Sequence, residues 1–407
     1  MIDQASRPAP EPLRILEIEA FGSGGLSHYV HNLACALAQR GHDVTLVTAA
    51  GYELEGQPRP AGFRVIGLIG RAARRGRSWL PARVLGWVRK VEALVDAFVV
   101  TGVVLWRRPD VVHLHSTNQI ALAYLILLRS IGVPVIVTAH VVTAHERSRL
   151  QDAIHRCIHR LSPLVIAHSE FDRARLVGEC KVVAERVVVI PHGDYGFFAR
   201  DADSVDRAQA RRDLGLAADA QAALFFGYIR EYKGLDLLLA AWPTVAAARP
   251  RARLVVAGDP VRLDANRRRE LEAAATRVGA VHRFAYIPFE EVTRYFAAAD
   301  VLVLPYRHVS QSGVLFLALA LGLPVIATRV GALPEVLRDG ESALLVDPGS
   351  IGELAEAVIR VLGDPDLRSQ LAAGGRRVAA QHAWPAIAAR TEAVFASSMR
   401  RDDHRDA

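Results

Sequence analysis

Two charged side chains in a short glycine-flanked loop are the residues of this sequence best suited to chemistry. Arg230 and Lys233 lie in the loop Gly227–Gly234, which follows an apolar run typical of a buried strand. Arginine offers a forked pair of donors and lysine a compact charge, so together they suit a diphosphate group. The loop is not the phosphate-binding pattern G-x-x-x-x-G-K-[ST], which the chain lacks. Two solvated loop cations are the alternative interpretation.

A second loop offers backbone donors for the same kind of ligand. The apolar run Val301–Leu304 is followed by a loop, and a helix-like segment begins at Gly313. The amides of Ser312, Gly313 and Val314 would have no partner within that helix, which favours an anion there. Because both loops follow strands of one predicted sheet, we expect them to converge at the carboxyl ends of its strands. Such a site would stabilise negative charge developing on a diphosphate leaving group.

The elements that must position these loops form two consecutive sets of alternating strands and helices. In the first set, Arg14–Ile18 and Asp43–Thr48 are predicted strands on either side of a predicted helix, Leu26–Arg40. In the second set, Ala222–Phe226 and Arg253–Ala257 open a similar series. The pattern predicts an α/β chain of two doubly wound domains.

Glycines and histidines mark the strand ends of the first set. Gly24 and Gly25 follow the first strand, where a phosphate or an acceptor molecule could approach the backbone; a tight turn without a ligand is the alternative. His113 and His115 lie on one face of a later predicted strand, and His140 ends the next strand. Site residues of parallel sheets gather at such ends.

We expect no metal site. His155 and His159 have a helical i, i+4 spacing that can hold a metal ion, but no third ligand is evident. The chain also has no Asp-x-Asp pair in a suitable loop. The cations Arg230 and Lys233 would make a divalent ion unnecessary, and no cofactor is expected.

Composition bounds the class of protein. The chain has 407 residues, half of them apolar, a formal net charge of +7 and three scattered cysteines. These features predict a globular protein of two domains in a reducing cytoplasm. The amino-terminal segment lacks the apolar core of a secretory signal. No nucleic-acid-binding motif accompanies the positive charge, so no nucleic acid partner is expected.

The segment Arg71–Lys90 differs from its surroundings in composition. It interleaves basic residues with tryptophan, leucine and valine, as amphipathic helices on anionic lipid do. The following apolar stretch, Val91–Trp106, is interrupted by acidic residues and is not predicted to span a membrane. We therefore expect peripheral contact with the cytoplasmic face of a membrane; a surface loop that leads into a crossover helix is the alternative.

The order of motifs along the chain resembles that of the retaining glycosyltransferases of family 4. The resemblance runs through GSGG, DVVHLH, VIPHGD, FFGYIREYKGLDLLLAAW, RLVVAGD, AAADVLVLPYR and GLPVIATRVGALPEVLRDGESALLVDP. It implies the GT-B fold, with two Rossmann-like domains that face each other across a cleft. Residues 1–198 would bind the acceptor, 199–383 the nucleotide sugar, and a helix in 384–407 would cross back to the first domain.

The resemblance also implies roles for individual residues. Arg230 and Lys233 look like the family's diphosphate-binding pair, and His140 like the histidine that faces the reacting sugar. The Gly24–Gly25 loop would lie near the phosphates and the acceptor. The implied activity is metal-independent, retaining transfer, of hexosyltransferase type, from a nucleotide-diphosphate sugar to a glycan or lipid-linked acceptor, without an assigned catalytic base.

One departure concerns the donor sugar. The family commonly has two glutamates spaced E-x7-E, one for the sugar and one for the ribose, at the positions of Val309 and Leu317 here. A branch of the family with SQSGV in this loop resembles this chain. Gln311 or Ser310 could contact the sugar hydroxyls instead. Glu335 is a nearby candidate carboxylate, with a structural loop acid as its alternative role.

Two other functions remain open for the same architecture. A sugar-nucleotide epimerase would need acid and base carboxylates around the sugar, and no convincing set is found. A non-catalytic relative is the other alternative, because both glutamates are missing. A nicotinamide-dependent dehydrogenase is not expected, since no G-x-G-x-x-G with a downstream acid follows the first strand.

Overall fold

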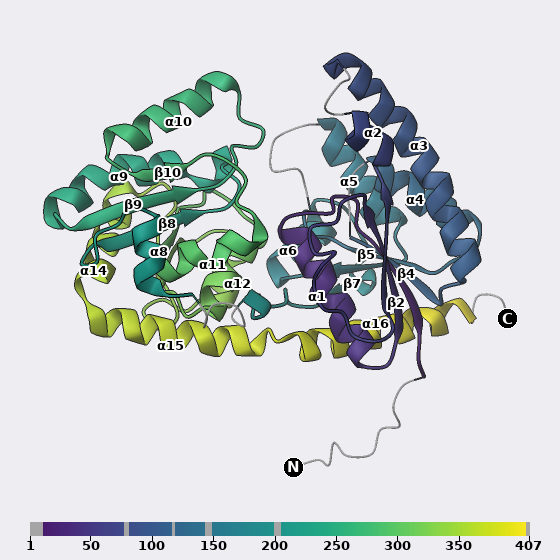
Figure 1. Cartoon of the computed structure of the whole chain (residues 1–407). Coiled ribbons are helices and arrows are strands. Elements are labelled where there is room, and N and C mark those ends of the chain that lie inside the picture. Colours follow the sequence, from purple (N-terminus) through teal and green to yellow (C-terminus); the bar gives the residue numbers. More distant parts are fainter. Residues whose placement is uncertain (1–10, 77–80, 116–118, 143–148, 199–204, 404–407) are drawn as a thin grey trace, which may run out of the picture. The chain divides into compact units, whose positions relative to one another are not determined.

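The chain forms two α/β units (Figure 1). The computed structural model describes residues 11–76, 81–115, 119–142, 149–198 and 205–403. The first unit comprises Met1–Pro191 together with Trp384–Ala407, and the second comprises His192–Ala383. The division thus falls between Pro191 and His192, whereas the sequence predicted it between residues 198 and 199.

The first unit is built on a seven-stranded parallel sheet in the order β3-β2-β1-β4-β5-β6-β7. Helices lie on both of its faces (Figure 1). Its strands are β1 (Arg14–Ile18), β2 (Asp43–Ala49), β3 (Phe63–Ile69), β4 (Val111–Leu114), β5 (Val135–Thr138), β6 (Leu164–Ala167) and β7 (Val187–Val189). Its helices are α1 (Gly25–Gln39), α2 (Arg71–Gly76), α3 (Ala82–Arg107), α4 (Gln119–Ser130), α5 (Arg149–Leu161), α6 (Glu170–Gly178) and α16 (Trp384–Asp403).

The second unit repeats the plan with six parallel strands in the order β10-β9-β8-β11-β12-β13. Its strands are β8 (Gln221–Phe226), β9 (Ala252–Ala257), β10 (Val281–Arg283), β11 (Val301–Leu304), β12 (Val325–Thr328) and β13 (Leu344–Val346). Its helices are α8 (Arg207–Asp213), α9 (Leu235–Ala248), α10 (Ala265–Arg277), α11 (Phe289–Ala298), α12 (Gly313–Ala320), α13 (Leu333–Val336), α14 (Ile351–Gly363) and α15 (Pro365–Gln381).

Both sheets reverse their strand order at one place. In the first unit β1 lies between β2 and β4, and in the second β8 lies between β9 and β11. The reversal lies between β1 and β4 in the first sheet and between β8 and β11 in the second. The connections after the two strands of each pair leave in opposite directions, and in sheets of this kind ligands bind in the crevice between the diverging loops. The predicted phosphate loops follow β8 and β11. The Gly24–Gly25 loop follows β1, and His115 follows β4.

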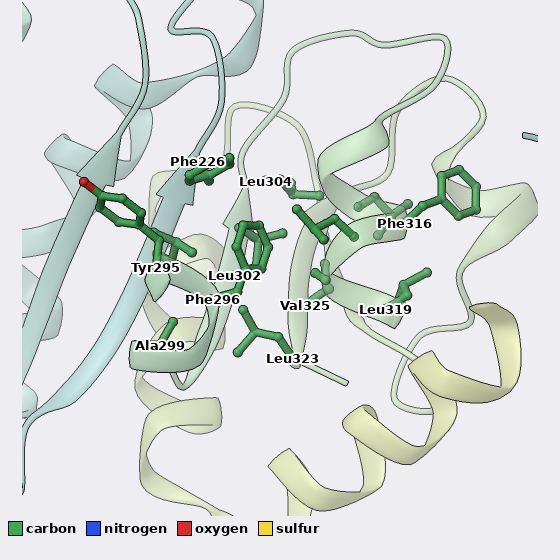
Figure 2. Packing of buried hydrophobic residues seen from close by; sticks show 14 of the residues in the cluster. Phe226, Tyr295, Phe296, Ala299, Leu302, Leu304, Phe316, Leu319, Leu323 and Val325 are labelled. Atoms are coloured by element: carbon green, nitrogen blue, oxygen red, sulfur yellow. The ribbon is translucent and has the colours of Figure 1, made fainter. Parts of the chain in front are cut away.

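Apolar side chains on both faces of the sheets hold each unit together. In the second unit, Figure 2 shows Phe226, Leu302, Leu304 and Val325 from the strands packed against side chains of α11 and α12. Strand residues such as Leu302 are fully buried because helices cover both faces of a parallel sheet. This packing fixes where the loops at the strand ends emerge.

The last helix, α16, packs against α1 in the first unit. Glu392 accepts a hydrogen bond from Arg40 at 2.5 Å, and its carboxylate lies 3.3 Å from His42 Nε2. The ring of Trp384 at the start of α16 lies 5.1 Å from that of Tyr29 on α1. The carboxyl-terminal helix is therefore an integral layer of the first unit.

Candidate active site

Three segments of the second unit meet where β8 ends. Gly227 has a φ of +97°, and a Cβ atom built on it would lie 3.1 Å from both Lys233 Nζ and Val314 Cγ2. The missing side chain lets the lysine amine and the first turn of α12 approach the same point. The structure thus brings together three residues that the sequence predicted to bind the ligand.

Lys233 is a buried cation. Its residue is 8% exposed, and its Nζ lies 5.6 Å from the centre of the Tyr306 ring. Burial, with added repulsion from Arg230, lowers the pKa of the Lys233 amine to about 7. Among the described residues, no carboxylate contributes to that pKa. A buried amine without a counter-charge suits an anionic ligand and is not the solvated loop cation of the alternative interpretation.

The loop that carries Lys233 is tied to the loop after β11. Gly234 adopts a left-handed conformation with a φ of +68°, and a Cβ atom there would overlap the carbonyl oxygen of Pro305. Arg307 N–H donates to the carbonyl of Tyr232 at 2.7 Å. The Arg307 guanidinium also donates two hydrogen bonds, of 2.8 and 2.9 Å, to Asp236 in the first turn of α9. These contacts hold both predicted phosphate loops in one arrangement.

The first turn of α12 presents backbone donors beside Lys233. Ser312 is its N-cap, and the Ser312 Oγ accepts from Leu315 N–H at 3.3 Å and contacts the Tyr306 hydroxyl at 3.2 Å. Within the described part of the chain, no acceptor is recorded for the N–H groups of Gly313 and Val314. The N-terminus of this helix therefore has free donors and a favourable dipole for a phosphate.

The two positions where the family has glutamates are part of the core. Val309 is 5% exposed and Leu317 4%, and both belong to the apolar cluster under α12. Gln311 is half-buried directly before the N-cap of α12, and Glu335 is exposed in the first turn of α13. A glutamate at either position would place a carboxylate in this apolar cluster and disrupt its packing.

A buried glutamate shapes the Gly24–Gly25 loop of the first unit. Glu19, which is fully buried, accepts hydrogen bonds from Phe21 N–H at 2.6 Å and Gly22 N–H at 2.9 Å. Two hydroxyls, of Ser27 and Thr48, donate to the same carboxylate. Burial raises the pKa of Glu19, although these four hydrogen bonds oppose the shift.

Gly24 itself is bound within the protein. Its N–H donates to Glu53 at 2.8 Å, and its φ of +78° requires glycine. Gly25 is the first residue of α1. The loop is thus a preformed turn, and Gly24 N–H would have to leave Glu53 to bind a phosphate.

The histidines of the first unit surround a glutamate that sequence reasoning missed. Glu17 Oε2 lies 2.9 Å from His113 Nδ1 and 2.6 Å from His115 Nε2. His140 contacts His115 with Nε2 and His168 with Nδ1, at 3.1 and 3.2 Å. Both ring nitrogens of His140 are therefore engaged by other histidines, so it offers a substrate no free ring N–H. A glutamate in the middle of an apolar strand was the signal.

The distances at Glu17 indicate hydrogen bonds rather than a metal site. Among the described residues, Glu17, His113 and His115 form the group of potential metal ligands. Their ligand atoms lie within 4.8 Å of one another. Ligands of a tetrahedral ion with bonds of about 2.1 Å lie about 3.4 Å apart, whereas Glu17 and His115 are 2.6 Å apart. His155 and His159, with ring centres 6.3 Å apart, gain no third ligand among the described residues.

The sequence matches families and proteins of known type. The profile named Glycosyltransferase Family 4 covers residues 23–193, and that named Glycosyl transferases group 1 covers 220–364. A D-inositol 3-phosphate glycosyltransferase of Thermobispora bispora is 30% identical over 93% of this chain and 91% of its own length. The chain belongs to glycosyltransferase family 4. It is a glycosyltransferase, as its motif order indicated.

Solved structures confirm the GT-B fold for this family 4 member. Sucrose-phosphate synthase from Thermosynechococcus elongatus superposes with a TM-score of 0.72 at 24% identity, over 94% of this chain and 98% of that one. HepE from Anabaena, solved in complex with UDP-glucose, gives 0.71 at 20% identity, over 95% and 100%. At these identities the likeness concerns the fold alone.

Proposed function

We propose that this glycosyltransferase moves a sugar, with retention of configuration, from a nucleotide-diphosphate sugar to a glycan or lipid-linked acceptor. The observation that carries the proposal is the buried Lys233 amine, which lies against Gly227 and Val314 without a carboxylate partner among the described residues. Lys233, Arg230 and the amides of Gly313 and Val314 supply positive potential for a leaving diphosphate.

The donor site would work without a divalent metal. A metal ion commonly neutralises the negative charge of a diphosphate. Here Lys233, Arg230 and the dipole of α12 would neutralise it instead. We assign no catalytic base among the described residues beside these groups, and we propose that a diphosphate oxygen accepts the acceptor's proton. Gln311 and Glu335 would contact the sugar or ribose, because Val309 and Leu317 are buried in the core.

The relatives support a choice of substrates to test first. HepE was solved with UDP-glucose, and the T. bispora relative is named for D-inositol 3-phosphate. We propose a UDP-hexose as the donor and include a phosphorylated polyol among the acceptors. A cation-rich donor site and a chain of net charge +7 both favour anionic substrates.

A donor screen tests the proposal directly. We expect one class among UDP-, GDP- and ADP-sugars to raise the melting temperature and to be consumed only when an acceptor is added. The same rate in the presence of EDTA would support metal independence, and NMR of the product anomer would report retention. Conversion of the donor alone would indicate the epimerase, and no stabilisation by any donor would favour a non-catalytic relative.

We also propose that helix α3 rests on an anionic membrane surface. One face of α3 packs in the core through Leu85, Val100 and Val104, yet the opposite face is also apolar. Trp87 is 70% exposed and Trp106 73%, and the exposed face further includes Val84, Val91, Leu94, Val95, Phe98, Val99 and Leu105. These residues, the α3 face, extend beyond the segment Arg71–Lys90 that the sequence indicated.

The charge around the α3 face favours a membrane as its occupant. Arg83, Arg89 and Lys90 are exposed near its start, and Arg108 near its end. A helix with such a face lies in the plane of the lipid interface, and the α3 face extends about 33 Å from Val84 to Trp106. Among the described helices, none combines the length and hydropathy needed to cross a bilayer. Residues 77–80 of the indicated segment lie outside the described residues.

Flotation with liposomes tests the α3 face. We expect the protein to float with vesicles that contain phosphatidylglycerol, and Trp87→Ser/Phe98→Ser/Trp106→Ser to reduce the floating fraction at least tenfold, since each residue buries a large apolar surface. Val183→Ser/Ile351→Ser, two exposed apolar residues elsewhere, is the control. Equal flotation of the triple variant would contradict the proposal, and a dimer in sedimentation that only the triple variant abolishes would indicate a second copy instead.

A further inference from the structure

A chain of three imidazoles connects a carboxylate to a backbone carbonyl in the first unit. Glu17 Oε2 contacts His115 at 2.6 Å, and His115 contacts His140 at 3.1 Å. His140 contacts His168 at 3.2 Å, and His168 Nδ1 lies 3.0 Å from the carbonyl oxygen of Ile190. All four contacts have hydrogen-bond length.

The two ends of this chain fix the number of protons within it. An ionised carboxylate and a carbonyl oxygen only accept, so the four hydrogen bonds need four protons on the three rings. Three neutral imidazoles carry three N–H groups in total. The chain is complete only with one additional proton, either on an imidazole or on Glu17. Without it, two acceptors would face each other somewhere along the chain.

The surroundings of Glu17 indicate that the additional proton lies away from Glu17, at His140 and His168. Burial opposes the charge of Glu17, but attraction and hydrogen bonds from His113 and His115 outweigh it and lower the pKa of Glu17 to about 2. Burial, with repulsion from His113, lowers the pKa of His115 to about 4. With Glu17 ionised and His115 neutral, the proton belongs to the His140–His168 contact.

Aromatic rings and His113 lie around the chain. The Tyr29 ring of α1 lies 4.8 Å from the His140 ring and 5.2 Å from the His168 ring. His113, whose Nε2 contacts the Thr138 hydroxyl at 2.7 Å, packs against Phe395 of α16. These groups lie on β4, β5, α1 and α16, and Trp384 of α16 lies beside Tyr29. His140 is half-buried, whereas the chain's other members are fully buried.

We propose that the Glu17–His115–His140–His168 chain stores one proton and thereby holds a positive charge at His140 for a phosphate group of a substrate. His140 follows β5, which is separated from β1 by β4 in the sheet, and its ring lies 4.8 Å from the Tyr29 ring of α1. The role of the charge rests on the proposed function, since it needs a substrate phosphate. Glu17, His115 and His168 are positioning residues, because they act through His140.

Nitrogen NMR of the full chain with ¹⁵N-labelled histidine counts the proton without reference to activity. At pH 7.5 we expect one imidazolium shared by His140 and His168, and neutral rings at His115, His31 and His159. His31 and His159 are buried histidines outside the chain, and burial lowers the pKa of each to about 4, so they serve as internal references. Neutral His140 and His168 rings would overturn the proposal from the wild-type spectrum alone.

Glu17→Gln tests the cause of the charge. Glu17 Oε2 faces both His113 Nδ1 and His115 Nε2, so a glutamine amide nitrogen in its place can donate one hydrogen to each ring. Three neutral rings then complete the chain. We expect the imidazolium signal to disappear, with the His31 and His159 signals unchanged. Persistence of the imidazolium in a folded Glu17→Gln variant would contradict the proposal that the Glu17 carboxylate requires the additional proton.

Activity assays then identify which phosphate meets the charge. We expect Glu17→Gln to lower kcat/KM on the order of tenfold, as loss of one partly screened charge implies. A loss confined to phosphorylated acceptors would indicate the acceptor, and an equal loss with unphosphorylated ones the donor diphosphate. Unchanged kcat/KM in both arms, with the imidazolium lost, would refute a role in substrate binding. Absence of any transfer by the wild type would instead count against the proposed function and leave the NMR result standing.

Discussion

Lys233→Met is expected to lower kcat by about 10²- to 10³-fold while the protein becomes no less stable. The amine is a buried charge beside Gly227 and Val314, and a methionine fills its volume without the charge. Burial of an amine without a counter-charge costs stability in the free protein, so its removal relieves that cost. Initial rates with saturating donor, and a thermal melt of the same preparation, measure both effects.

The pH dependence of that stability has a defined sign. The pKa of Lys233 falls from 10.5 in the unfolded chain to about 7 in the folded protein. Between these values the unfolded chain binds the additional proton, so the wild type gains stability as the pH rises from about 7 toward 10. The stability advantage of Lys233→Met is therefore greatest at and below pH 7 and shrinks above it.

The control for this substitution is Lys181→Met, because Lys181 is exposed and lies in the first unit. It should change neither the rate nor the pH profile of stability. Wild-type turnover by Lys233→Met, or by the double variant Arg230→Ala/Lys233→Ala, would refute the assignment of the diphosphate site. A large loss of stability in Lys233→Met would show that the amine has a structural partner.

Gly234→Ala is expected to destabilise the second unit by about 3 kcal/mol or more and to impair transfer. A left-handed backbone costs an alanine about 1–2 kcal/mol, and overpacking adds about 1–3 kcal/mol. At Gly234 the new Cβ would overlap the Pro305 carbonyl, which is backbone and cannot rotate away. The displaced loop carries Lys233, so kcat should fall together with stability. Urea unfolding followed by circular dichroism, with hydrogen exchange in α9 to localise the effect, measures it.

Gly279→Ala separates strain from crowding. Gly279 has a φ of +69°, against +68° at Gly234, but no atom lies within 4 Å of its Cβ position. The Gly279→Ala variant should lose about 1–2 kcal/mol of unfolding free energy from the strained backbone alone. Its rate of sugar transfer should be unchanged. Equal costs for the two variants would show that the contact with Pro305 does not hold the loop.

The sequence predicted the framework of this protein because strands and helices follow local apolar patterns. The runs Arg14–Ile18 and Val301–Leu304 are strands with the predicted bounds. Parallel pairing follows from the alternation of strands with helices, since a crossover must return the chain to the same edge. The motifs were sufficient to indicate family 4 and the GT-B fold, both of which are confirmed.

Other features followed from no local pattern. The strand β3 was not among the predicted elements. The apolar residues of α3 gave no sign of which would face solvent, because both faces of the helix are apolar and only packing against the sheet distinguishes them. That distinction moved the expected membrane contact from Arg71–Lys90 toward Trp106.

The sequence by itself determined the residues of the phosphate loops and the fold that carries them. Types and spacing near Lys233 and Gly313 were enough, because strand ends of a parallel sheet share one edge. Only the tertiary structure decided their electrostatic state. Burial under α12 and Tyr306 makes Lys233 a titrating amine, and Glu17 joins histidines from three strands into one proton-holding chain. Desolvation and hydrogen-bond partners depend on residues far apart in the chain, which no local pattern specifies.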